Sequence, residues 1–248
     1  MAGEPRAVRS VSRAIGILRL LAKEERLTSA EVSKLTGFPK SSVHEILITL
    51  NEERLIIRNS ETGKYSLGIG LFELGDAARK ELEVRAVAEP HLRALNQKLD
   101  ETVQLSIVDD NEVLFLDAFE STKRLRTYSV IGVRSPAYCS SAGKCILAFS
   151  EQKVIDTYLK EVRLDRFTSK TIADADDFRA ELKKVKEQGF AIDDIEHEED
   201  VRCVGAPVFN HNKQAVAAVS ITAPSGRLRI AKVPAYAKAV MATANEVS

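Results

Sequence analysis

A short glycine-containing turn between two amphipathic segments, Thr36-Gly-Phe-Pro39, constrains the fold of this chain more than any other feature. Before it, Thr28 and Glu31 have the spacing of a capping box, in which the two side chains satisfy free N–H groups at a helix start. Gly37 suits the left-handed residue that ends a helix, and Pro39 suits the beginning of the next one. Two helices joined by so short a turn predict a helix-turn-helix.

The segments on either side extend this motif into a winged helix. Apolar residues at helical spacing predict a first helix over residues 11–23, ahead of the helix-turn-helix at about 28–47. Residues 55–58 and 64–67 then flank a glycine-containing turn, which predicts a β-hairpin. We therefore expect residues 1–68 to form a winged helix-turn-helix domain.

The third predicted helix begins with small, polar and basic side chains, which suit a helix that enters the major groove of DNA. Its N-terminus favours phosphate oxygens, and cations flank the hairpin where a wing would follow the DNA backbone. A winged helix used for protein contact is the alternative. The candidate DNA-binding residues are Arg13, Lys40, Ser41, Ser42, His44, Arg58 and Lys64.

Charge and composition agree with a polyanion partner for the N-terminal part. The whole chain has 36 Lys and Arg against 36 Asp and Glu, yet residues 1–70 have 11 against 8 and include a basic N-terminal arm. The sequence contains no apolar run of roughly 18 residues, which is the length that a membrane-spanning helix needs. The odd count of three cysteines favours a reducing compartment. We expect a cytoplasmic protein with no membrane contact.

A helical linker and an α/β domain are predicted for the rest of the chain. Residues 69–85 have an amphipathic pattern, and Glu89-Pro90 should break or kink the helix before a second one starts at Pro90. Residues 86–248 combine strand hairpins with helices, which predicts an α+β domain with a mostly antiparallel sheet. The expected strands are 103–108, 112–119, 128–133, 190–194, 204–209 and 215–222, and the expected helices are 142–149, 151–160, 174–188 and 230–246.

Two catalytic or reactive patterns remain as alternatives. Ser141 and Lys144 fit the Ser-x-x-Lys spacing of some acyl enzymes, although the companion motifs are absent. The three thiols, Cys139, Cys145 and Cys203, allow a redox sensor. A metal would require Asp193, Asp194, His197 and Cys203 to converge. We predict no catalytic residue, no cofactor and no metal.

A ligand pocket is the better interpretation of the polar residues in this domain. Ser140–Gly143 opens a helix, and free backbone N–H groups at such a start attract anions. Asp193 ends a strand, and Ser220 and Thr222 alternate on one face of another. Together with the small apolar surface of Val201 and Cys203, they suit a small polar molecule.

The whole chain from about residue 8 resembles the IclR family of bacterial transcriptional regulators. The residues that carry the resemblance are Arg9-Ser-Val-Ser-Arg-Ala-Ile-Gly-Ile-Leu18, Gly37-Phe-Pro-Lys-Ser-Ser-Val-His44, Tyr65-Ser-Leu-Gly68, Ser140-Ser-Ala-Gly-Lys144, Gly189-Phe-Ala-Ile-Asp-Asp194 and Val201-Arg-Cys-Val-Gly-Ala-Pro207. The resemblance implies a GAF-like effector domain after the linker. It also implies a homodimer, often a dimer of dimers, on a palindromic DNA operator.

The resemblance further implies which residues bind the effector. Ser141 stands where glycine is common in the family and Thr222 where serine is common, so both narrow the pocket and add hydroxyl groups. The expected function is a ligand-responsive regulator, a repressor rather than an enzyme, with a small organic acid or related molecule as effector. The implied ligand-binding residues are Ser141, Ala142, Asp193, Val201, Cys203, Ser220 and Thr222.

Overall fold

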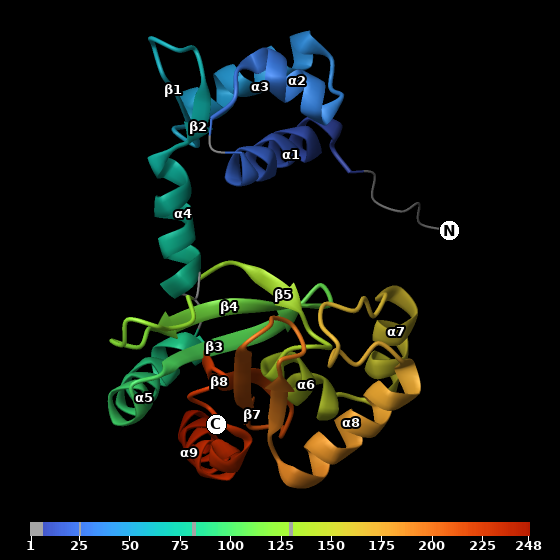
Figure 1. Ribbon diagram of the computed structural model, residues 1–248. Coiled ribbons are helices and arrows are strands. Elements are labelled where there is room, and N and C mark those ends of the chain that lie inside the picture. The colour runs from blue at the N-terminus through green and yellow to red at the C-terminus, as the bar shows by residue number, and fades with distance from the viewer. Residues whose placement is uncertain (1–6, 25, 81–82, 129–130) are drawn as a thin grey trace. The chain divides into compact units, whose positions relative to one another are not determined.

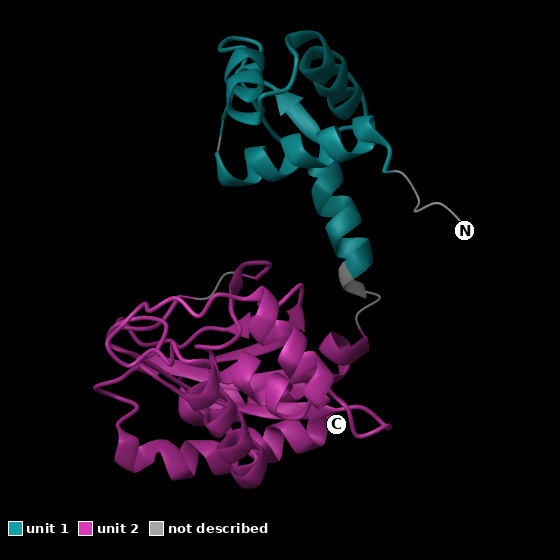
Figure 2. Cartoon of the chain, turned by 90° about the vertical axis from the view of Figure 1, so that its right-hand side faces the viewer, with its two compact units in different colours: residues 1–82 teal, residues 83–248 magenta. Residues whose placement is uncertain are grey.

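The computed structural model describes residues 7–24, 26–80, 83–128 and 131–248, and the chain forms two compact units (Figure 2). The units are Met1–Leu82 and Glu83–Ser248. The boundary between them falls inside the predicted linker 69–85, whose residues 81–82 lie outside the described residues. Residues 1–6 of the predicted basic arm also lie outside them.

The N-terminal unit is a winged helix-turn-helix, as predicted (Figure 1). Thr28 and Glu31 form the capping box at the start of the second helix, and Gly37 ends that helix at φ 70°. Ile17, Val32 and Leu47, one from each helix, are fully buried together, and each contributes about 1.5–3 kcal/mol by leaving water. The elements are α1 (Arg9–Lys23), α2 (Ser29–Thr36), α3 (Lys40–Glu52), β1 (Ile56–Arg58) and β2 (Tyr65–Leu67).

The predicted break at Glu89-Pro90 is wrong. Helix α4 spans Ile69–Lys80, and helix α5 spans Glu83–Leu99 and continues through Pro90. Ala88 and Leu92, on either side of the proline, are fully buried, and α5 packs against β3, β4 and α9. The free energy gained by this packing on both sides of Pro90 offsets the loss of the backbone hydrogen bond that the proline cannot donate.

The C-terminal unit contains a six-stranded sheet in the order β5-β4-β3-β8-β7-β6. Every neighbouring pair is antiparallel, which confirms the predicted antiparallel sheet. The strand expected at 128–133 is misplaced: the strand there is Arg134–Pro136, and residues 129–130 lie outside the described residues. The strands are β3 (Thr102–Asp109), β4 (Glu112–Phe119), β5 (Arg134–Pro136), β6 (Ala191–Asp194), β7 (Val201–Phe209) and β8 (Ala215–Pro224).

Helices cover both faces of this sheet. Helices α5 and α9 pack together on one face (Figure 1). On the other face, α6 lies against β3, β7 and β8, and α8 packs against α6. The start of α6 therefore lies over the polar residues of the central strands. The remaining elements are α6 (Ser141–Ala148), α7 (Gln152–Glu161), α8 (Ala175–Gln188), the short 3₁₀ helix η1 (Ile230–Lys232) and α9 (Val233–Val247). The GAF-like assignment stays a prediction.

Candidate functional site

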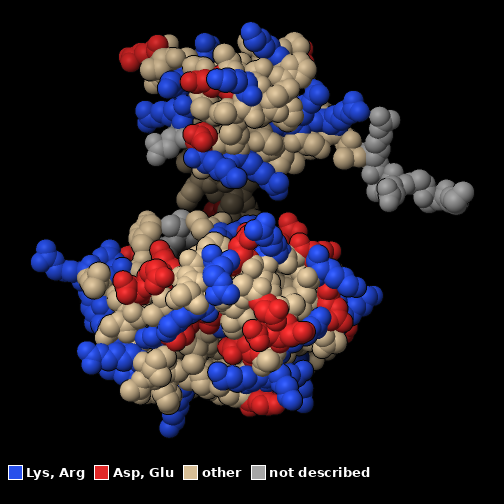
Figure 3. All heavy atoms as spheres, turned by 45° about the vertical axis from the view of Figure 1, so that its right-hand side comes forward, with Lys and Arg blue, Asp and Glu red and all other residues tan. Residues whose placement is uncertain are grey.

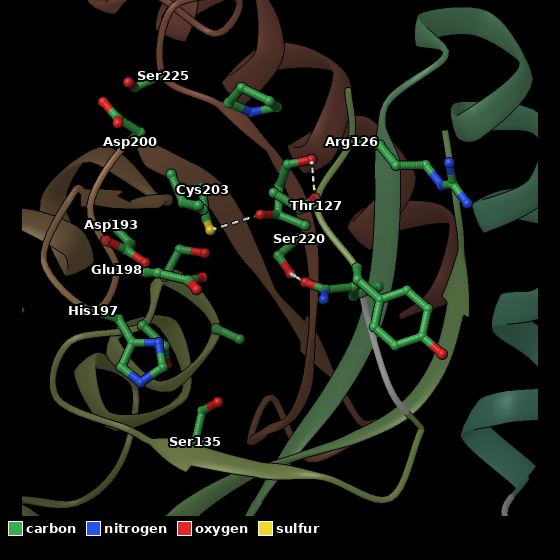
Figure 4. Close-up of a pocket in the computed structure, with 18 of the residues that line it drawn as sticks. Arg126, Thr127, Ser135, Asp193, His197, Glu198, Asp200, Cys203, Ser220 and Ser225 are labelled. Atoms are coloured by element: carbon green, nitrogen blue, oxygen red, sulfur yellow. Dashed lines mark hydrogen bonds between the residues drawn. The ribbon is translucent and has the colours of Figure 1, made fainter. Parts of the chain in front are cut away.

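A cavity of about 830 Å³ opens between the start of α6 and the strands of the C-terminal unit. Figure 4 shows Asp193, Cys203, Ser220 and His197 around it. The structure brings all the sequence-predicted ligand-binding residues to the wall of this one cavity, although they lie far apart in the chain. They are Ser141, Ala142, Asp193, Val201, Cys203, Ser220 and Thr222.

The first turn of α6 presents unused N–H groups to the cavity. The Ser140 hydroxyl caps the helix by accepting the N–H of Gly143 at 3.0 Å. A Cβ on Gly143 would overlap the carbonyl oxygen of Ala137 and lie 2.7 Å from its carbonyl carbon, so only glycine permits this close approach. Among the described residues, the N–H groups of Ser141 and Ala142 have no hydrogen-bond acceptor. They are therefore free to bind a ligand acceptor.

A polar row crosses the sheet beneath this helix start. Asp193, Cys203 and Thr222 are register partners on β6, β7 and β8. The Cys203 thiol donates to the Thr222 hydroxyl at 3.2 Å. One row away, the Ser220 hydroxyl donates to Gln104 Oε1 at 3.3 Å (Figure 4). The cavity floor therefore offers hydroxyl, thiol and carboxyl groups in fixed positions.

Asp193 contributes a buried carboxyl group to this row. Its side chain is almost fully buried, at 4% exposed, and Oδ1 accepts the Glu196 N–H at 2.8 Å. Burial raises the pKa of its carboxyl to about 7, and the neighbouring Glu196 carboxylate also raises it. Near neutral pH this group is therefore able to donate as well as accept a hydrogen bond.

Lys144 lies behind the cavity, as part of a buried ion pair. Its Nζ donates to Glu196 Oε1 at 2.6 Å and to Glu181 Oε1 at 3.3 Å. Burial alone would lower the pKa of the Lys144 ammonium. The two carboxylates outweigh this effect, and the pKa is raised above its usual value. A lysine held protonated in this way cannot take a proton from Ser141. The Ser-x-x-Lys pattern thus marks an internal ion pair, and the hydrolase alternative loses its base.

The three thiols are poorly suited to redox sensing. Burial raises the pKa values of Cys139 and Cys145 to about 12 and the pKa of Cys203 well above its usual value. Because the thiolate is the reactive form, protonated and largely buried thiols react slowly. The redox-sensor alternative therefore gains no support from their surroundings.

The possible metal ligands at the end of β6 and in the following loop do not gather around a metal position among the described residues. Asp194, one of the possible ligands, accepts from Arg202 Nε at 2.6 Å and from Lys170 Nζ at 2.8 Å. In the described ranges, no cluster of three or more His, Cys, Asp or Glu side chains has the geometry to hold a metal ion. None of the described helices is long and apolar enough to cross a membrane.

The predicted DNA-binding residues divide into two groups. Lys40, Ser41 and His44 are exposed on α3, and Arg58 is exposed on β1. Figure 3 shows Lys and Arg side chains outnumbering Asp and Glu over the N-terminal unit on the face in view. These exposed side chains are free to meet DNA.

Arg13 and Ser42, in contrast, already contact each other. Arg13 Nη1 donates to Ser42 Oγ at 3.2 Å, and its guanidinium lies 5.4 Å from the centre of the Phe38 ring. The pair therefore joins α1 to α3 and positions the helix start. Lys64, across the hairpin turn from Arg58, is half-buried.

Several cavity residues were missed at the level of sequence. Gln104 lines the cavity from β3, His197 lines it from the loop after β6, and Arg126 lines it from the loop after β4. Gln104 had a signal, because it is a polar residue inside an apolar strand. Arg126 had none: it lies in an irregular segment, where its Nε pairs with Glu120 Oε2 at 2.9 Å.

An exposed winged helix and a separate domain whose cavity is lined by buried polar side chains are typical of one class: DNA-binding regulators that respond to small molecules. Two family models match this chain. The model described as "Bacterial transcriptional regulator IclR C-terminal" matches residues 77–248, and the model described as "IclR helix-turn-helix domain" matches residues 10–60. The chain belongs to the IclR family of bacterial transcriptional regulators.

Individual relatives agree along nearly the whole chain. The HTH-type transcriptional regulator KipR of Bacillus subtilis is 32% identical over 97% of this chain and 96% of its own length. The transcriptional repressor IclR of Escherichia coli is 27% identical over 97% of this chain and 89% of its own length. A solved IclR transcriptional regulator from Alicyclobacillus acidocaldarius is 26% identical, covers 98% of both chains and superposes with a TM-score of 0.87.

Proposed function

We propose that this regulator is a cytoplasmic repressor that binds a palindromic DNA operator as a homodimer and responds to a small organic acid. The free N–H groups of Ser141 and Ala142, inside a cavity of about 830 Å³, are the observation that carries the proposal. They supply two donors and the positive end of a helix to one carboxylate. The repressor mode follows the relative that is named a repressor.

The other cavity residues have complementary roles in this proposal. Asp193 and the row formed by Cys203 and Thr222 hold the polar part of the effector opposite its carboxylate. Val201 and Ala142 provide apolar surface, and Ser220 fixes the far end. Effector binding favours one arrangement of the paired DNA-binding units, which requires a different effector affinity in the two arrangements.

The dimer is proposed from apolar side chains that the chain leaves exposed. Val11 and Ile15 lie exposed on α1, and Ile69 and Phe72 lie exposed on α4, with Phe72 at 70%. Exposed apolar residues grouped on one unit favour contact with another protein surface. A second copy is the partner that a two-fold symmetric operator requires. A measurement of the molecular mass in solution tests this dimer and distinguishes it from a dimer of dimers.

The DNA contacts are proposed from exposure and residue type. Lys40 and Ser41 lie at the N-terminus of α3, where they reach phosphate oxygens, and His44 reaches a base edge one turn later. Arg58 and Lys64 hold the wing against the backbone. Arg13 and Ser42 keep α3 in place, and both remain within reach of phosphate.

The direct test is titration of the full chain against labelled DNA from upstream of its own gene, with excess unrelated DNA. We expect specific binding that weakens steeply with salt. Asp193→Ala should retain this DNA affinity and lose the response to added acids, and Asp193→Asn serves if the alanine variant does not fold. Equal affinity for specific and unrelated DNA, there and in a genome-wide selection of DNA fragments, would refute the regulator.

A further inference from the structure

A second pocket, of about 520 Å³, lies on the C-terminal unit beside the turn that follows β8. Three of its lining residues are cationic, none is an Asp or Glu, and none belongs to α6. A concave surface with charges of one sign attracts ions of the opposite sign, here anions. The lining residues are Leu125, Pro224, Gly226, Arg227, Arg229 and Lys232.

The turn that carries these cations is fixed by buried groups. Leu228, between the two arginines, is fully buried. The buried Arg202 donates from Nη1 to the carbonyl oxygens of Ser225 at 3.1 Å and Leu228 at 2.6 Å. The Leu228 N–H in turn donates to the carbonyl oxygen of Pro224 at 3.0 Å. The cationic side chains therefore project from a preorganised backbone, so less ordering is needed when they bind a ligand.

The three cations differ in how far the protein itself uses them. Arg227 donates from Nε and Nη2 to the two carboxylate oxygens of Glu101, both at 2.6 Å. Arg229 donates only from Nε, to the carbonyl oxygen of Gly226 at 3.1 Å. Within the described residues, the Nη groups of Arg229 and the ammonium of Lys232 have no partner, and both residues are exposed. Two positive charges are thus available to a ligand in this pocket.

A phosphate monoester is the anion that these free groups suit. The two Nη groups of a guanidinium present parallel N–H donors that match two oxygens of one phosphate, and an ammonium adds a second positive charge. A monoester carries up to two negative charges near neutral pH and so balances both cations, whereas a carboxylate or a phosphodiester carries one.

We propose that Arg229 and Lys232 form a phosphate-binding site on the C-terminal unit and that its ligand is a small phosphate monoester. The site is distinct from the α6 start and does not depend on the acid effector. Leu125, Pro224 and Gly226 line both this pocket and the cavity. A bound monoester therefore lies against a segment that also forms part of the cavity wall.

The test is calorimetric titration of the full-length protein at low salt, because salt screens exposed charges. The probes are glycerol 3-phosphate, the diester dimethyl phosphate, and glycerol. We expect saturable binding of glycerol 3-phosphate, roughly fivefold or more weaker binding of dimethyl phosphate, and no binding of glycerol.

Substitutions then assign the binding to the two free cations. Arg229→Ala should lower the affinity for glycerol 3-phosphate by roughly tenfold, and Lys232→Ala by roughly threefold. Arg229→Lys should remain clearly weaker than the natural protein, because a point charge does not reproduce the paired donors. Arg124→Ala is the matched control: it removes the same charge from an exposed arginine that does not line the pocket, and it should keep the affinity.

Three results would overturn the inference. The absence of saturable binding of glycerol 3-phosphate up to roughly 10 mM refutes the site. An equal loss of affinity in Arg229→Ala and Arg124→Ala means that overall charge attracts the anion without a defined site. Equal affinity for dimethyl phosphate means that the pocket suits the phosphodiesters of nucleic acid instead of a monoester. Each of these results leaves the acid effector, which is proposed for the other cavity, untouched.

Discussion

Two helices of this protein carry a pair of serines at or beside their first turn, yet the surroundings of the two starts differ. In α3, Lys40 and Ser41 are exposed, Ser42 accepts a hydrogen bond from Arg13, and the N-cap residue Pro39 makes no side-chain hydrogen bond. In α6, Ser140 caps the helix and Ser141 is buried. Both starts carry the positive end of a helix. In the function proposed above, burial decides whether that positive end meets a long polyanion or a single small acid.

The largest expected effect tests how α6 is held in its buried position. Gly143→Ala introduces a Cβ that overlaps the backbone of Ala137, where no side chain can move aside. We expect a loss of roughly 3 kcal/mol or more in the unfolding free energy of the C-terminal unit, measured by urea denaturation.

Gly75→Ala in α4 is the matched control for this change. Nothing lies within 4 Å of a Cβ at that position, and alanine in a helix is favoured over glycine by up to about 1 kcal/mol. Equal destabilisation by the two substitutions would show that the close approach to Ala137 does not hold the first turn of α6.

The second prediction concerns Asp193, the buried carboxyl group that lines the cavity at the start of α6. No buried carboxyl group is described beside the start of α3. Because the pKa of Asp193 is raised from 3.8 to about 7, the folded state binds a proton that the unfolded state releases. This part of the stability is present at pH 4 and is lost as the pH rises toward 7, by roughly 4 kcal/mol at most.

Asp193→Asn removes this titration and keeps an oxygen for the Glu196 N–H. Relative to the natural protein, the variant should therefore gain stability between pH 4 and pH 8 in urea unfolding experiments. Asp176→Asn, which removes an exposed carboxylate on α8, is the control. A stability difference between variant and natural protein that does not change with pH would contradict the raised pKa.

The starts of α3 and α6 differ in how much of their structure could be predicted from the sequence. The capping box at Thr28 and the turn at Gly37 are local signals, and both appear in the structure as predicted. The α6 start is also visible locally, but its burial depends on strands that follow about 60 to 80 residues later. The positions around the cavity were assembled through resemblance, because spacing along the chain does not reveal which strands become neighbours.

The wrong prediction at Pro90 and the open alternative at Lys144 have the same origin. Pro90 lies inside α5 because the packing of Ala88 and Leu92 outweighs the local cost of the proline. The spacing of Lys144 to Ser141 left a catalytic alternative open, because the partner Glu196 lies 52 residues away. Long-range contacts therefore decided the cases in which local patterns pointed elsewhere.

The smallest expected effect tests the exposed helix start. Lys40→Ala should weaken binding to specific and unrelated DNA to a similar degree, by less than about tenfold, because a phosphate contact carries no sequence information. The slope of log affinity against log salt should fall by about 0.9 if one phosphate contact is lost. Lys153→Ala, an exposed lysine on α7, should leave both quantities unchanged. An unchanged slope in Lys40→Ala would mean that the α3 start does not bind phosphate, and the contrast with α6 would then rest on burial alone.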